Sequence, residues 1–275
     1  MANFIKLRNI PFRLAVLWLA VVLIAAVTAP WWPVPAPDRI DPELLAAPPG
    51  AAHLLGTDSM GRDIGARLLF GSRVSLVVGF CAPFTGMLLG VLLGIPAGFY
   101  RGRYERFVLF LLDTLLAFPG LIFLLVFTFI VGASLPTITV GLGILIAPRF
   151  ARVARANTIR FAEREFVLAA RGIGASDFSI IMREILPNLL TPLLVYMLLS
   201  VGYVIIAEGG LSFLGLSVPA PAPSWGGMIA GGRDLLDQAP HICLIPTLVM
   251  FLTVLSVNLI GDQLRPKLDS RESRL

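Results

Sequence analysis

Charged residues are scarce in this sequence. Lys, Arg, Asp and Glu make up 14% of the 275 residues, and hydrophobic residues make up 57%. Soluble domains have roughly 25% charged and about 45–50% apolar residues, so this chain has too few charges to cover a soluble core. The mean hydropathy of +0.86 indicates that lipid is the solvent. The composition therefore argues against a soluble enzyme, a disulfide scaffold and a disordered tail.

Cysteine, histidine and catalytic motifs are also nearly absent. Cys81 and Cys243 lie in apolar runs, so we expect buried thiols rather than a disulfide framework. His53 and His241 have no further candidate ligand at zinc-site spacing. The sequence contains no G-x-x-x-x-G-K-[ST] phosphate loop, H-E-x-x-H pair or nucleophile elbow. We expect no catalytic residue, metal or cofactor in this chain, so energy for any transport must come from another polypeptide.

Long apolar runs are the main feature of the chain. A membrane helix needs about 20 apolar residues to cross the bilayer. The stretch 107–148 contains one charge, Asp113, and is about twice too long for one span, but residues 132–136 (Gly-Ala-Ser-Leu-Pro) offer a break. The sequence therefore predicts an all-α integral membrane protein with six transmembrane helices. The other four runs are 14–37, 74–100, 185–207 and 238–261.

The uncharged segment 209–232 differs from these runs because it is rich in glycine and proline. Such a composition predicts that no regular helix forms there. Irregular backbone facing lipid would leave polar groups unpaired, so the segment must lie at the surface or against protein. We expect a structured external loop.

The positions of Lys and Arg predict the orientation. With a cytoplasmic N-terminus, 17 of the 22 basic residues lie in segments expected inside. The C-terminus is then cytoplasmic as well. The basic surplus follows from topology, so no nucleic-acid partner is needed to explain it.

A helix and a glycine elbow are predicted in the longest segment expected in the cytoplasm, about 149–184. Residues 160–171 are good helix formers with two small residues, Ala169 and Ala170, near the end. Gly172 and Gly174 then break the helix. Small alanines would let a partner's surface come close.

A second short helix is predicted after the elbow. Ser176 or Asp177 can cap a helix over residues 178–186, and Pro187 is expected to end or kink it. The two helices would project from the membrane between the fourth and fifth spans. The pattern fits both a docking element and a solvated connecting loop.

Two acidic residues and a proline are further candidates. Asp113 lies inside a span, where a carboxylate indicates either a functional site or a structural hydrogen bond to a neighbouring helix. Pro119 is expected to kink the same helix. Glu208, at the outer end of the fifth span, either faces a substrate or is an interfacial charge without a contact.

Residues before the second span form a polar cluster. His53, Asp58, Arg62 and Asp63 are more typical of caps that orient a short helix than of a metal site. We expect an interfacial helix over residues 61–71, with Leu68, Leu69 and Phe70 facing lipid. Trp31, Trp32 and Trp225 are expected to be interface anchors.

The helix–elbow–helix segment resembles the cytoplasmic EAA loop of binding-protein-dependent ABC importer permeases. Ala169, Ala170, Gly174, Leu186 and Pro187 match its motif, whereas Leu168 replaces the usual Glu. In that family the loop docks on the ATPase. The resemblance therefore implies ATPase coupling through Glu165, Ala169, Ala170, Arg171, Gly174, Ala175, Leu186 and Pro187.

Other motifs resemble the peptide/nickel branch of that family, and most closely its C-type dipeptide and oligopeptide permeases. Together they cover nearly the whole chain, although Pro266 and Ser270 depart from the branch pattern. The resemblance and the candidates above place Asp113, Phe118, Pro119 and Glu208 on the translocation path. The motifs are HLLGTD at 53–58 with GRD at 61–63, LAFP at 116–119, LSFLGL at 211–216 with PSWG at 223–226, and NLIGD at 258–262.

The resemblance implies a type I ABC importer permease fold with a cytoplasmic coupling helix, in the bacterial plasma (inner) membrane. Its partners would be membrane lipid, a homologous second permease, an external substrate-binding protein, and two cytoplasmic ATPases that hold ATP and magnesium. Residues 1–72 would form the N-terminal tail, first span and external segment. Residues 73–262 would form the transmembrane domain, with the EAA loop at about 149–190. Residues 263–275 would be a cytoplasmic tail.

The sequence does not fix the transported substrate, and it leaves two other classes of membrane protein as alternatives. Dipeptides, oligopeptides, nickel chelates and other small peptides all fit the same class of permease. A self-powered secondary carrier would show several buried charges and inverted repeats. This sequence has one buried charge and no obvious repeat. A membrane scaffold would need no path between its helices.

Overall fold

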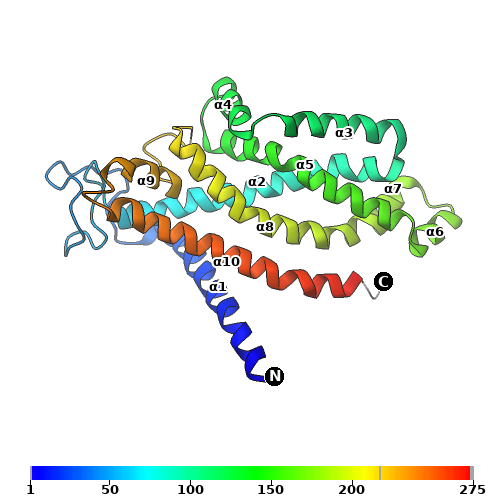
Figure 1. The fold of residues 1–275 in the computed structure, drawn as a ribbon, viewed down its shortest axis with the longest axis horizontal. Coiled ribbons are helices and arrows are strands. Elements are labelled where there is room, and N and C mark those ends of the chain that lie inside the picture. Colours follow the sequence, from blue (N-terminus) through cyan, green and yellow to red (C-terminus); the bar gives the residue numbers. More distant parts are fainter. Residues whose placement is uncertain (1, 217, 273–275) are drawn as a thin grey trace. The chain divides into compact units, whose positions relative to one another are not determined.

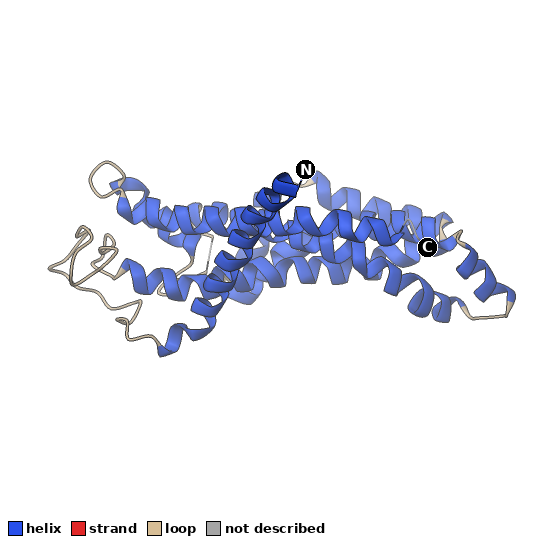
Figure 2. Ribbon diagram, turned by 90° about the horizontal axis from the view of Figure 1, so that it is seen from below, coloured by secondary structure: helices blue, strands red, loops and turns tan. Residues whose placement is uncertain are grey.

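The structure is a computed structural model that describes residues 2–216 and 218–272. Every named element in this part of the chain is helical (Figure 2). An isolated bridge joins Thr57 and Asp63. In chain order the elements are α1 (Ala2–Thr28), η1 (Ala29–Trp31), α2 (Ile64–Tyr100), α3 (Gly102–Ala117), α4 (Gly120–Val131), α5 (Leu135–Ala162), α6 (Glu165–Gly172), α7 (Asp177–Ile180), η2 (Ile181–Ile185), α8 (Leu186–Phe213), α9 (Trp225–Gly232), η3 (Arg233–Leu235) and α10 (His241–Glu272).

The chain divides into two compact units. Unit 1 comprises the residues up to Phe80, Phe127–Thr139 and Val201–Ile260, and unit 2 comprises the remaining segments. The long helices α2, α5, α8 and α10, which are labelled in Figure 1, therefore each contribute residues to both units. The expected domain boundary at 72/73 falls within α2, and α10 continues through the expected tail to Glu272. Residues 273–275 of that tail lie outside the described residues.

The helices are consistent with the six expected spans. Among the described residues, five helices are long and apolar enough to cross a membrane, and the bent pair α3–α4 gives a sixth if it forms one span. The expected break is confirmed, because α4 ends at Val131 and α5 begins at Leu135. Pro119 does more than kink its helix: α3 and α4 meet at 92° on either side of Phe118 and Pro119.

Unit 2 is built on a close contact between α2 and α5. Four glycines of α2, spaced four residues apart, lie on one face of the helix. A Cβ at Gly90 would come within 2.4 Å of Phe150 Cβ, and a Cβ at Gly94 within 2.4 Å of the Ala151 carbonyl oxygen. The backbones therefore approach each other more closely than any side chain would allow. The four glycines are Gly86, Gly90, Gly94 and Gly98.

Unit 1 contains a helix where the sequence predicts none. α8 continues to Phe213, and α9 forms over Trp225–Gly232 despite its four glycines. The reason is tertiary: Trp225 is fully buried, its backbone N–H donates to Ser75 Oγ at 3.0 Å, and its indole N–H donates to the Leu68 carbonyl at 3.3 Å. The prediction of wholly irregular structure was wrong, and so was the prediction that Trp225 is an interface anchor.

The expected interfacial helix over residues 61–71 is also wrong. α2 begins at Ile64 and runs on without a break, and Leu68 is 9% exposed rather than facing lipid. The predicted capping is confirmed, since the Asp63 carboxylate accepts the Ala66 N–H at 2.6 Å and binds His53 Nδ1 at 2.7 Å. Among the described residues no group of three metal-ligating side chains comes together.

Apolar runs do not predict burial within this chain. Cys81, expected to be buried, is exposed, and Cys243 is half-buried. In a membrane protein, apolar side chains also face outward into lipid or toward other subunits, so hydropathy alone cannot separate the two faces of a helix. Both thiols are free, as expected.

We expect Gly90→Ala to destabilise the protein by about 1–3 kcal/mol, because the added methyl group forces α2 and α5 apart. Gly71→Ala is the matched control within α2, since its Cβ would meet the nearest atom at 3.5 Å and alanine favours a helix by about 1 kcal/mol over glycine. Thermal unfolding in detergent should show a lower Tm for Gly90→Ala alone. Equal Tm values for the two variants would contradict the close approach.

Candidate functional site

The turn between α6 and α7 is fixed by backbone hydrogen bonds. Gly174 adopts φ +82°, its N–H donates to the Arg171 carbonyl, and the Ala175 N–H donates to the Ala170 carbonyl, both at 3.0 Å. This is the Schellman arrangement, which requires a left-handed residue and therefore favours glycine. The predicted glycine elbow is confirmed.

The predicted cap of the second helix is also confirmed. Ser176 precedes α7, and its side chain accepts the Ser179 N–H. Pro187, however, does not end this helix. Five residues of π-helix, Ile181–Ile185, join α7 to α8, with the Leu186 N–H donating to the Ile181 carbonyl. The wider π turn accommodates the proline ring, which would clash with a carbonyl in a regular α-helix, so the chain stays helical into α8.

Four large apolar side chains of this segment are exposed. They come from α6, the elbow, α7 and the π turn, and we call them the tip surface. Val167, Ile180 and Ile185 of the same segment are buried, so the segment has an inner and an outer apolar face. An outer apolar face surrounded by charges is typical of a protein contact. The tip surface consists of Leu168, Ile173, Phe178 and Met182, which are 53%, 87%, 69% and 45% exposed.

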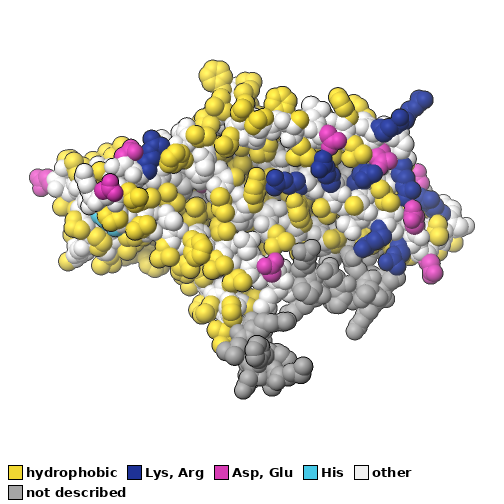
Figure 3. All heavy atoms as spheres, in the orientation of Figure 1, with side chains coloured by type: hydrophobic (Ala, Val, Ile, Leu, Met, Phe, Trp, Pro, Cys, Tyr) yellow, Lys and Arg dark blue, Asp and Glu magenta, His cyan; other side chains and the backbone are white. Residues whose placement is uncertain are grey.

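The segment is fastened to the rest of unit 2 by charged side chains. The Arg171 guanidinium lies 5.2 Å from the centre of the Phe99 ring at the end of α2. Arg101 donates to Glu163 at 2.7 Å, just before α6. On the face drawn in Figure 3, basic and acidic side chains gather where α3, α5 and α6 lie. These contacts hold the start of the segment against the ends of α2 and α5.

The structure brings the predicted coupling residues into this one segment. Glu165 begins α6, Arg171 lies in its last turn, and Gly174 forms the elbow. Their docking role stays a prediction. The exposed members are Glu165, Ala169, Arg171, Gly174 and Pro187, and the half-buried ones are Ala170, Ala175 and Leu186.

Asp113 binds a neighbouring helix. Of the two roles expected for it, this contact fits the structural hydrogen bond. Arg152 of α5 donates to its carboxylate at 2.6 Å. A second pair links the same two helices, with Arg155 Nε donating to Glu105 at 2.6 Å. Sequence reasoning missed both arginine partners. The signal was the three-residue spacing of Arg149, Arg152 and Arg155, which places them on one side of α5.

The bend at Phe118 and Pro119 borders an apolar groove in unit 2. Phe118 is 56% exposed, and the Pro119 carbonyl accepts the N–H groups of Ile122 and Phe123. The groove has a volume of about 510 Å³, and its lining from α2, α3, α4 and α5 includes Leu93, Leu115 and Phe118. With no charged residue in its lining, this groove offers apolar contact rather than an ion site.

Glu208 lies in unit 1 and is 1% exposed, so the expectation of an interfacial charge without a contact is wrong. Its carboxylate accepts hydrogen bonds from Ser212 at 3.0 Å and Ser224 at 2.9 Å. Ser224 also caps α9 by accepting the Gly227 N–H at 3.0 Å. Glu208 thus joins the end of α8 to the start of α9, and its place on a path stays a prediction.

The sequence model of the family described as "Binding-protein-dependent transport system inner membrane component" matches residues 90–274. This chain belongs to that family. A Brucella abortus protein named as a permease of a peptide transport system is 40% identical over 96% of this chain and 89% of the relative. GsiD of Pectobacterium atrosepticum, a glutathione transport system permease protein, is 38% identical over 87% of this chain and 79% of the relative.

Solved structures show the same fold. A chain of the MetNI methionine ABC transporter, in an inward facing conformation, aligns with a TM-score of 0.60 over 74% of this chain and 96% of that chain. At 19% identity this likeness concerns the fold alone. The binding-protein-dependent permease described here is therefore an all-α, multi-pass membrane protein with the fold of ABC importer membrane subunits.

The two ion pairs between α3 and α5 should differ in strength. Glu105 and Arg155 are 17% and 30% exposed, against 60% and 52% for Asp113 and Arg152. A double-mutant cycle with Glu105→Gln and Arg155→Gln should give a coupling energy of about 1–3 kcal/mol. The cycle with Asp113→Asn and Arg152→Gln should give less than about 1 kcal/mol, because this exposed pair lies near the expected cytoplasmic end of the span, where interfacial water can screen it. A larger coupling energy for the Asp113–Arg152 pair than for the Glu105–Arg155 pair would show that exposure does not set the strength of these ion pairs.

Proposed function

We propose that this permease forms, with a homologous second permease, the path by which an ABC importer carries dipeptides or oligopeptides across the bacterial plasma membrane. The observation that carries the substrate class is the 40% identity, over 96% of the chain, to a relative named for peptide transport. The GsiD relatives support the same class, because glutathione is itself a small peptide. Nickel or another small peptide-like cargo is the alternative within the same transporter class.

The energy for transport comes from two ATPase subunits that bind ATP and magnesium. This chain has no phosphate loop, so we assign ATP binding to the partner subunits and propose that this chain is a permease and not an enzyme. The tip surface is the docking site for an ATPase: it is apolar, exposed and surrounded by charged residues of both signs. An external substrate-binding protein delivers the cargo on the opposite side. The excess of arginine in the loops expected inside supports a cytoplasmic location for both termini.

Transport follows from a shift between two helix arrangements. A nucleotide state of the ATPases can drive such a shift only if it binds one arrangement better than the other. The coupling segment, residues 165–187, can transmit that preference because the Gly174 elbow fixes its turn and the helix runs from α7 through η2 into α8 without a break. Movement of the tip surface therefore moves a membrane helix.

We expect Ile173→Ser to weaken ATPase binding by about tenfold or more, since truncating a well-packed apolar contact at an interface costs about 1–2 kcal/mol or more. Ile173 is 87% exposed, so the substitution removes little contact within the permease. Co-purification with the ATPases and ATP-driven uptake in proteoliposomes measure the effect.

Leu54→Ser is the matched control. Leu54 is 82% exposed and lies between α1 and α2, in a loop assigned to the external side. ATPase assembly should be unchanged in this variant. If Ile173→Ser assembles and transports as well as Leu54→Ser, the tip surface is not the docking site.

The cargo is tested separately by uptake. Cells that lack this permease should lose accumulation of a labelled dipeptide or tripeptide and regain it when the gene is restored. Nickel accumulation should stay the same in both strains. Loss of nickel uptake with normal peptide uptake would overturn the substrate class and leave the transporter class intact.

A further inference from the structure

The outward face of α3 in unit 2 changes from basic to apolar along the helix. Arg103 and Arg106 are exposed near its start, and the exposed side chains of Phe107, Phe110 and Leu111 follow them. Arg103, Phe107 and Leu111 are spaced four residues apart, so they lie along one side of the helix. This side therefore offers positive charge at one end and apolar surface beyond it.

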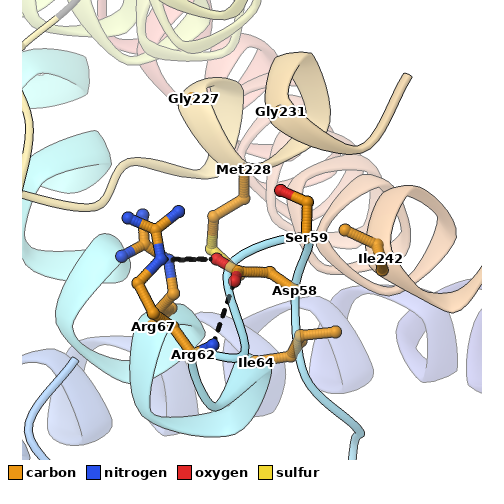
Figure 4. Close-up of a pocket in the computed structure, with 9 residues that line it drawn as sticks. All are labelled: Asp58, Ser59, Arg62, Ile64, Arg67, Gly227, Met228, Gly231 and Ile242. Atoms are coloured by element: carbon orange, nitrogen blue, oxygen red, sulfur yellow. Dashed lines mark hydrogen bonds and ion pairs between the residues drawn. The ribbon is translucent and has the colours of Figure 1, made fainter. Parts of the chain in front are cut away.

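Arg103 and Arg106 are available to an anion from outside the chain. Neither forms an ion pair with another residue in the part of the chain that the structure describes. Arg62 and Arg67 of unit 1 differ, because both lie beside the Asp58 carboxylate (Figure 4). Three acids near the start of α3 already bind other arginines. These pairs are Glu105–Arg155, Asp113–Arg152 and Glu163–Arg101.

Two exposed tyrosines accompany these arginines. Tyr100 ends α2, and Tyr104 lies in the first turn of α3. Tyrosine is enriched at the boundary between membrane and water, and arginine side chains near helix ends extend toward that boundary. The composition at the start of α3 is therefore typical of a helix end at the level of the lipid headgroups.

The apolar part of this face continues into the groove of about 510 Å³. Leu111 and Thr114 of α3 line the groove together with residues of α2, α4 and α5. Thr114 is the single polar residue of the lining, and its hydroxyl donates to the Phe110 carbonyl at 2.7 Å. Leu111 follows Arg106 by five residues, about 8 Å along the helix axis. A charged group and an apolar chain of one ligand can therefore reach both parts.

We propose that an anionic phospholipid occupies this face, with its phosphate on Arg103 and Arg106 and an acyl chain in the groove. Guanidinium groups bind phosphate through charge-assisted hydrogen bonds. A free phosphate ion would fit the arginines and leave the groove without an occupant. A homologous second permease would bring its own arginine-rich end to the same side of the membrane, so like charges would meet.

A lipid in this position contacts both sides of the bend at Phe118 and Pro119, because α3 and α4 both line the groove. A ligand that binds the folded state stabilises it in proportion to its occupancy. The site therefore makes the stability of unit 2 depend on anionic lipid, whatever cargo the transporter carries.

The first experiment measures Tm of the full chain in a neutral detergent with added phosphatidylglycerol, phosphatidylcholine or sodium phosphate. Phosphatidylglycerol should raise Tm by about 2–5 °C in a saturable manner. Phosphatidylcholine, which has no net charge, should raise it less, and sodium phosphate should not raise it. An equal response to the two lipids would overturn the role of the arginines, and an equal response to sodium phosphate would overturn the role of the groove.

The double variant Arg103→Gln/Arg106→Gln should weaken phosphatidylglycerol binding by about 25-fold, because each basic residue near an anionic lipid surface contributes a factor of about five. Both side chains are exposed, so the variant should fold. Arg73→Gln is the matched control, since Arg73 is an exposed arginine of α2 in unit 1, and it should keep the wild-type affinity. Equal affinities of the two variants would overturn the proposal.

The second experiment identifies the occupant of the groove in the complete transporter within its membrane. A photoreactive benzoylphenylalanine replaces Thr114, which lines the groove, or Leu92, which is exposed on α2 and does not line it. Adducts at position 114 should be phospholipids enriched in anionic headgroups, whereas adducts at position 92 should have the composition of the bulk lipid. An adduct of position 114 with the second permease or with the transported peptide, or the same lipid composition at both positions, overturns the proposal.

Discussion

The close contact between α2 and α5 is the interaction on which the rest of unit 2 depends. Between helices in lipid there is little hydrophobic driving force, so association relies on close van der Waals packing and on hydrogen bonds. Glycines at four-residue intervals in α2 provide that packing, because a Cβ at Gly90 or Gly94 would overlap atoms of α5. A helix fixed so closely at its centre gives its ends defined positions. The charged end of α5 can then serve as a platform.

That platform carries the candidate site. Beyond the glycine contact, α5 presents Arg152 and Arg155 to the acids of α3, and Arg101 binds Glu163 just before α6 begins. Each pair is modest on its own, but together they fix α3 and the start of the coupling segment on the same rigid helix pair. The Gly174 elbow then turns the chain back into the membrane helix α8. In the proposed coupling, a force on the tip surface would be transmitted through backbone hydrogen bonds rather than through a flexible loop.

Features that depend on local chemistry could be predicted from the sequence. The spans follow from the length of apolar runs, and the elbow and the α7 cap follow from Gly174 and Ser176. Features that depend on contacts distant in the chain could not. The helix containing Trp225 exists because Ser75 and Leu68, about 150 residues away, satisfy its polar groups. Helix propensity is a weak guide where tertiary contacts of this kind decide the backbone. The arginine partners of Asp113 and Glu105 could not be predicted for the same reason, because they are also distant in the chain.

Exposed apolar side chains have two different meanings in this protein. Along the spans they are surrounded by other apolar residues, as Phe129 is at 87% exposure, and lipid or a neighbouring membrane subunit accounts for them. Ile173, equally exposed at 87%, lies in a segment with eight charged residues between 160 and 184. Those charges belong in water, and water disfavours an exposed isoleucine by the same free energy that drives burial in soluble proteins. Lipid does not account for this exposed isoleucine, which supports the proposal that a partner protein docks on the tip surface.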